Sequence, residues 1–111
     1  MDEAVKYVEK NYPQTARAFK SIQHDQYVLF CKKQKDYGSF NITQGGDMSV
    51  EDDKLFALTG LIIRMNDKMN RLVNLIRKQL TPENESIEDA FQDISIYGII
   101  SKVVSEDSWG K

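Results

Sequence analysis

The sequence predicts an all-α fold: a compact helical bundle of three long helices plus a short N-terminal helix. Three segments, residues 15–37, 55–80 and 87–105, carry apolar residues at three- and four-residue offsets, which is the period of one face of an α-helix. Turn formers and prolines stand between them. Because 111 residues are enough for one hydrophobic core but not for two, we expect residues 1–111 to form a single domain.

The first helix is expected over residues 2–11 and the second from about Thr15 to Tyr37, on either side of Pro13. Gly38 ends the second helix, because glycine adopts the left-handed backbone conformation that stops the helical hydrogen-bond ladder. Lysines in the last turn suit the partial negative charge at that end.

Residues 39–53, SFNITQGGDMSVEDD, contain paired glycines and no sustained periodicity. They predict a flexible loop of about fifteen residues, a length often found in lids over functional sites. The next helix is expected from Leu55 to Leu80. One stripe of this helix is apolar and is expected in the core, namely Leu61, Ile62, Met65, Met69, Leu72, Val73 and Ile76.

The last helix is expected from Ile87 to about Ser105, because Ser86 and Asp89 resemble a capping box. The β-branched residues of SIYGII would also suit a strand, but the length that follows the capping signal favours a helix. An exposed polar edge is expected from Glu88, Gln92, Ser95 and Lys102, and almost everything else after Asp93 is apolar. This helix therefore needs neighbours on several sides, and we expect at least a dimer. The residues expected to mediate self-association are Ile96, Ile99, Ile100, Val103 and Val104.

Composition and motif searches exclude several function classes. A net charge of -2 argues against a general binder of duplex nucleic acid. No apolar run approaches the roughly 18–20 residues that cross a bilayer, and the amino terminus lacks an apolar signal core, so we expect a cytoplasmic protein without a membrane partner. Cys31 and His24 each stand alone, and no glycine-rich phosphate loop or Cys/His metal spacing is present.

Two rows of charged residues are the candidates for chemistry. Arg64, Lys68 and Arg71 form a basic row beside the apolar stripe of their helix. Asp93 has apolar helical neighbours, so its carboxylate is expected in a partly desolvated space, and Asp89 lies one turn earlier. These acids can share a divalent cation or hold the basic row in register through salt bridges, and the sequence leaves both possibilities open.

The segments FCKKQKDYGSFNI, LTGLIIRMNDKMNRLVNLI and NESIEDAFQDISIYGII, with a terminal SWGK, resemble the family called nucleotide modification associated domain 1. The resemblance covers roughly residues 18–111. It implies an all-α, phage-associated protein that binds or handles a nucleotide or modified nucleotide in the cytoplasm of a bacterial host.

The resemblance also implies a set of site residues. In this sequence they are Lys33, Asp36, Tyr37, Gly38, Asn41, Arg64, Asp67, Lys68, Arg71, Asn74, Glu85, Ser86, Asp89, Asp93 and Tyr97. Tyr37 is expected to stack on a base and Asn41 to read its edge, while Gly38 lets the backbone approach closely. The cations of the basic row are expected to meet phosphates.

The pattern is also loosely similar to the all-α nucleoside triphosphate pyrophosphatases, whose metal site uses acidic pairs on two helices. The cluster of Glu88, Asp89 and Asp93 matches one half, in which Asp89 and Asp93 would hold Mg²⁺, but no paired glutamates supply the other half. Three hypotheses follow: a magnesium-dependent pyrophosphohydrolase, a non-catalytic nucleotide binder, and a homo-oligomeric structural or interaction module.

Overall fold

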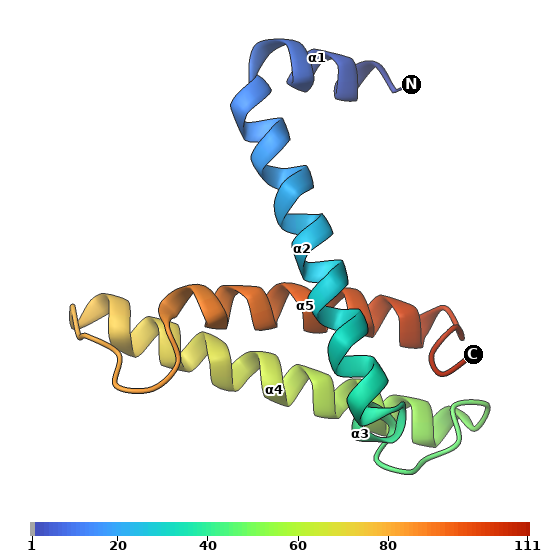
Figure 1. Ribbon diagram of the computed structural model, residues 1–111. Helices are drawn as coiled ribbons and strands as arrows, with labels where there is room; N and C mark the ends of the chain where they lie inside the picture. Colours follow the sequence, from blue (N-terminus) through green and yellow to red (C-terminus); the bar gives the residue numbers. More distant parts are fainter. Residues whose placement is uncertain (1) are drawn as a thin grey trace. The chain divides into compact units, whose positions relative to one another are not determined.

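A computed structural model describes residues 2–111 and is all-α over that range (Figure 1). Its helices are α1 (Glu3–Asn11), α2 (Pro13–Tyr37), α3 (Phe40–Thr43), α4 (Glu51–Arg77) and α5 (Ile87–Ser105). The predicted fold class, with three long helices and a short helix before them, is confirmed. The chain divides into two compact units, the first ending at Lys33 and the second running from Gln34 to Lys111.

The first unit consists of α1 and most of α2. The carboxylate of Asp2 caps α1 by accepting a hydrogen bond from the Ala4 backbone N–H at 2.7 Å. Pro13 opens α2, a position where its missing N–H costs nothing and its fixed φ suits a helix. An ion pair between Lys20 and Glu9 joins the two helices. No side chain of α1 is buried, so this unit has little core of its own.

The second unit is built on α4 and α5, which lie side by side and run in opposite directions (Figure 1). Ser86 caps α5 by accepting a hydrogen bond from the Asp89 N–H at 3.1 Å, as its position before the acidic first turn predicts. Small and branched apolar side chains fill the space between the helices. Those buried are Ala57, Leu61, Leu72 and Leu75 of α4 with Ala90, Ile96, Ile100 and Val104 of α5.

The predicted loop over residues 39–53 is wrong in part, because it contains the one-turn helix α3 and the first residues of α4. Four residues are too few to show a helical period in the sequence. Burial stabilises this turn: the exposed fractions of Ile42 and Thr43 are both 4%, and α3 packs against α4. The side chain of Trp109 is also buried, and its Nε1–H donates a hydrogen bond to the Ser39 carbonyl at 3.0 Å.

The predicted core stripe of α4 is correct for Leu61 and Leu72 only. Of the other members, Met65 is half-buried, and four stand exposed: Ile62, Met69, Val73 and Ile76. α5 covers a face of α4 that is turned away from these residues by roughly a quarter of the circumference. α4 therefore has two neighbouring apolar faces, and the single stripe predicted from the sequence combined residues of both.

The structure also revises the surface expected for self-association. Ile96, Ile100 and Val104 are buried within the chain itself, so three of the five named residues already have apolar neighbours. Of the other two, Ile99 is 53% exposed and Val103 is half-buried. Within residues 2–111, no helix combines the length and the apolar character that a membrane crossing requires.

Candidate functional site

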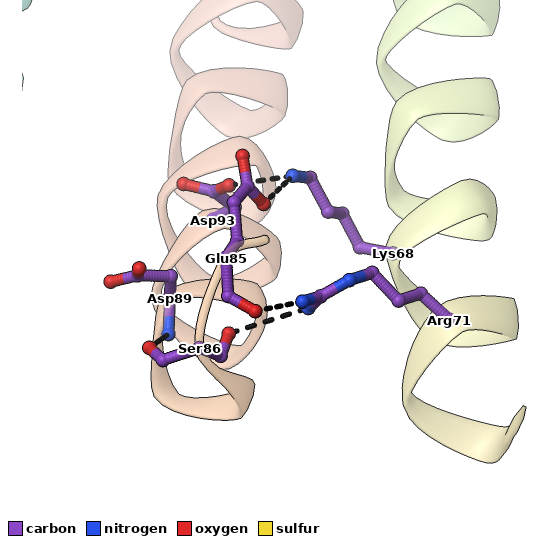
Figure 2. A network of polar contacts seen from close by, with 6 residues as sticks. All are labelled: Lys68, Arg71, Glu85, Ser86, Asp89 and Asp93. Atoms are coloured by element: carbon purple, nitrogen blue, oxygen red, sulfur yellow. Dashed lines mark hydrogen bonds and ion pairs between the residues drawn. The ribbon is translucent and has the colours of Figure 1, made fainter. Parts of the chain in front are cut away.

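Two members of the basic row, Lys68 and Arg71, reach from α4 toward α5 and the connector that precedes it (Figure 2). Arg64, Lys68 and Arg71 follow one another at offsets of four and three residues, so their side chains leave the helix on one side. Each is half-buried rather than fully exposed. Each also has a defined partner, and these partners determine what the site can do.

Lys68 stands between two carboxylates. Its Nζ lies 2.6 Å from Oε2 of Glu85 and 3.0 Å from Oδ2 of Asp93. The two acids differ in their surroundings: the side chain of Asp93 is 18% exposed on α5, whereas that of Glu85 is 51% exposed on the connector. Lys68 therefore has one partner held inside the helix pair and one partner near water.

These contacts shift the protonation equilibria in the direction of the charged forms. The hydrogen bond that Lys68 donates to Glu85 raises the pKa of Lys68, burial works against this, and Asp93 adds to the increase. In return, the hydrogen bond from Lys68 lowers the pKa of Glu85. At neutral pH the Lys68 ammonium and the Glu85 carboxylate are therefore ionised.

Arg71 holds the backbone of the connector. Its guanidinium donates hydrogen bonds to the carbonyl of Ser86 at 3.3 Å and to the carbonyl of Glu85. Because Ser86 also caps α5, Arg71 fixes the point at which α5 begins. This fixation places Glu85 where its carboxylate reaches Lys68 (Figure 2).

Arg64 joins α3 to the same row. Its Nη2 donates to the backbone carbonyl of Asn41 at 2.8 Å, and its guanidinium carbon lies 5.8 Å from the centre of the Tyr97 ring. That distance allows a cation–π contact. The side-chain oxygen Oδ1 of Asn41 is buried without a hydrogen-bond partner. The structure thus brings together three predicted residues from separate motifs, namely Asn41, Arg64 and Tyr97.

Several other predicted residues are exposed in the structure. Tyr37 is 66% exposed, and Asp36 and Asp67 are also exposed. Gly38 has a φ of +69° and its N–H donates to the Gln34 carbonyl at 2.9 Å, so helix termination accounts for its conformation. Lys33 is exposed and belongs to the first unit, and Asn74 is exposed on α4.

The predicted magnesium ligands do not fit a metal as they stand. Asp93 already accepts from the Lys68 ammonium, and the carboxylate of Asp89 points away from α4 (Figure 2). Within residues 2–111, no group of three or more His, Cys, Asp or Glu side chains has the arrangement of a metal site. Magnesium binding stays a prediction.

The importance of Glu85 to Lys68 was not apparent from helical periodicity. Glu85 precedes α5, so a helical wheel gives it no direction. The signal available was its place in the polar segment TPENES directly before the N-cap residue. Connectors at this position put side chains beside the first turn of the following helix.

The site can bind an anion through guanidinium and ammonium groups at neighbouring positions on one helix face. Comparison with known proteins adds no assignment: no protein-family model, curated protein or solved structure matches this chain.

Proposed function

We propose that the protein binds a phosphate-bearing small molecule, a nucleotide or modified nucleotide, in the second unit beside Lys68. The supporting observation is the difference in solvent exposure between the two carboxylates that flank this lysine. Asp93 is 18% exposed and Glu85 is 51% exposed. Glu85 is an exchangeable anion at the position that a ligand phosphate would occupy, while Asp93 keeps the ammonium oriented.

The neighbouring cations suit this role. Arg64 and Arg71 lie about one helical turn, roughly 5–6 Å, on either side of Lys68 along α4. Both are half-buried and held by backbone carbonyls, so their side chains are ordered before any ligand arrives. Order of this kind reduces the entropy lost on binding.

A nucleotide is favoured over a nucleic acid as the ligand because of charge. The chain carries a net charge of -2, whereas duplex binding draws on many phosphate contacts from one basic face. The Tyr97 ring beside Arg64 supplies an aromatic surface near the cations, as recognition of a base requires. The resemblance to the nucleotide modification associated domain 1 family supports the same ligand class.

The proposal is tested by calorimetric titration of nucleoside mono-, di- and triphosphates into the purified protein. Lys68→Met should weaken binding by at least about tenfold, the loss of one charge-assisted contact. Glu85→Gln should tighten binding, since it removes the competing carboxylate. Glu88→Gln is the matched control, because Glu88 is exposed in the first turn of α5, whereas Lys68 pairs with Glu85 and Asp93. Weaker binding in Glu85→Gln would contradict the exchange.

Hydrolysis is a separate part of the proposal and is tested separately. The resemblance to all-α pyrophosphatases predicts release of pyrophosphate from a nucleoside triphosphate in the presence of Mg²⁺. Incubation at high protein concentration, with and without a chelator, decides the matter. Binding without any product would leave the non-catalytic binder.

A homo-oligomeric interaction module is the second candidate function. The observation that favours it is the number of large apolar side chains exposed in the second unit, since contiguous exposed apolar patches often mark interaction sites. This function is compatible with nucleotide binding, because the exposed apolar residues of α4 lie on a different side of the helix from the basic row.

A further inference from the structure

Within residues 2–111, the helix α4 has a second apolar face whose side chains are only partly covered. Along it lie five side chains that are about half exposed: Leu55 at 51%, Ile62 at 61%, Met69 at 50%, Val73 at 48% and Ile76 at 52%. At 100° per residue these five fall within roughly 60° of one another. The stripe spans about 32 Å of helix.

The spacing of this face is that of a helix packed against another helix. Leu55, Ile62, Met69 and Ile76 recur every seven residues. Leu58, Met65 and Leu72 repeat three residues after the first three of these and border the face that packs on α5. A heptad repeat with apolar residues at two of its positions is typical of coiled-coil contacts. The heptad pattern therefore extends from the face that packs on α5 to the exposed stripe, and it predicts that another helix packs on this stripe.

The charges at the two ends of α4 indicate which helix fits. The first turn contains Glu51 and Asp52, and the helix ends at Arg77 and Lys78, all of them exposed. Two copies of α4 in antiparallel order would set the acidic end of each against the basic end of the other. A parallel pair would instead place like charges together.

We propose that α4 pairs with α4 of a second copy of this chain, antiparallel, through the stripe from Leu55 to Ile76 and about a twofold axis near Met65. In this arrangement Leu55 of one copy lies near the Ile76 end of the other. The inference rests on the second candidate function and specifies its interface. It replaces the C-terminal helix as the main surface for self-association.

The size of the face is enough for a specific dimer. Five half-exposed side chains amount to roughly 100 Å² each and about 500 Å² per copy, so the pair would bury about 1,000 Å², which is the size that a specific interface should reach.

The test is the mass of the full chain in solution, measured by sedimentation equilibrium from nanomolar to micromolar concentration. We expect twice the mass of one chain. The double variant Ile62→Glu/Met69→Glu should weaken the dimer by at least about 100-fold, since it puts charges at the centre of the contact. Both side chains are at least half exposed in the single chain, so helicity should not change.

Ile63→Glu is the matched control. Ile63 is 57% exposed and follows Ile62 directly, but it points about 100° away from the stripe. This variant should remain a dimer with unchanged affinity. A dimer that survives Ile62→Glu/Met69→Glu, or one that is lost equally in Ile63→Glu, would overturn the inference.

Cross-linking tests the orientation in a Cys31→Ser background, which removes the exposed native thiol. With a short bismaleimide, a mixture of Leu55→Cys and Ile76→Cys chains should cross-link to each other. Leu55→Cys alone should not, because its two copies would be about 30 Å apart in an antiparallel pair. Cross-linking of Leu55→Cys to itself would overturn the antiparallel order.

The outcomes also separate this inference from the function on which it rests. A single-chain mass at all concentrations would overturn both. A dimer that is abolished by Phe19→Glu, a change at an exposed residue of α2, and not by the α4 variants would keep the interaction module and overturn the α4 interface.

Discussion

The ion pair between Lys68 and Asp93 should stabilise the second unit more than the shorter contact between Lys68 and Glu85. The relevant variants are Lys68→Met, which keeps the methylene stem, and Asp93→Asn and Glu85→Gln, which keep the side-chain shape. Combining Lys68→Met with each of the other two gives two double-mutant cycles that share one variant.

The magnitudes follow from exposure rather than distance. The side chains of Lys68 and Asp93 are 22% and 18% exposed and lie 3.0 Å apart. This pair falls between exposed pairs, worth about 0–1 kcal/mol, and buried pairs, whose disruption costs about 3–5 kcal/mol. We expect a coupling of about 1–2 kcal/mol. The Glu85 side chain is 51% exposed, although its Oε2 lies only 2.6 Å from Nζ of Lys68. Solvent screening should therefore hold the coupling of this pair below about 0.5 kcal/mol.

The coupling energies are obtained from urea unfolding followed by far-UV circular dichroism, with the slope m checked for each variant. Glu85 raises the pKa of Lys68 more than Asp93 does, although the coupling energies are expected in the reverse order. Burial should decide the coupling energy, because a hydrogen bond to a water-exposed carboxylate is replaced by one to water at little cost. A Glu85 coupling equal to or larger than the Asp93 coupling would refute this reasoning, and with it the idea that Glu85 is exchangeable.

Three further results are expected. Trp109→Ala should destabilise the second unit by about 3–4 kcal/mol, the cost of truncating a buried aromatic side chain, in the same urea assay. Lys68 lowers the pKa of Glu85 below its ordinary value of 4.5. Their contact should therefore stabilise the fold above about pH 4.5 and lose that effect as the pH falls through the lowered pKa. The free energy of unfolding of Lys68→Met should accordingly fall less on acidification than that of the unchanged protein. Asp93→Asn should weaken nucleotide binding more than Glu88→Gln does, and equal affinities in the titration would favour a purely structural Asp93.

The sequence was sufficient to predict the long helices because their signals are redundant. α5 begins directly after Ser86, where a capping residue, an acidic first turn and an apolar period agree. α1 runs over Glu3–Asn11, close to the expected residues 2–11. The start of α4 at Glu51 rather than Leu55 was missed, because its first turn is acidic and has no apolar residue to show the period.

The direction of each side chain was harder to predict. The proximity of Lys68 and Asp93 followed from two helix faces, but the role of Glu85 depended on the path of a connector. On α4, Ile62 and Leu61 are neighbours in sequence with opposite burial. A helical wheel gives the angle between them and not the position of α5, so only tertiary packing decides which of the two is covered.

The hydrogen bond from Trp109 to Ser39 spans 70 positions of sequence, and this span dictates an order of assembly. Closing so long a loop from an open chain costs entropy that one contact does not offset. The hairpin of α4 and α5 has a short connector and can close earlier, after which the remaining search for Ser39 is local. The sole tryptophan of the chain is therefore a built-in reporter of the final step: in stopped-flow refolding, its fluorescence should settle after the helical signal has already recovered.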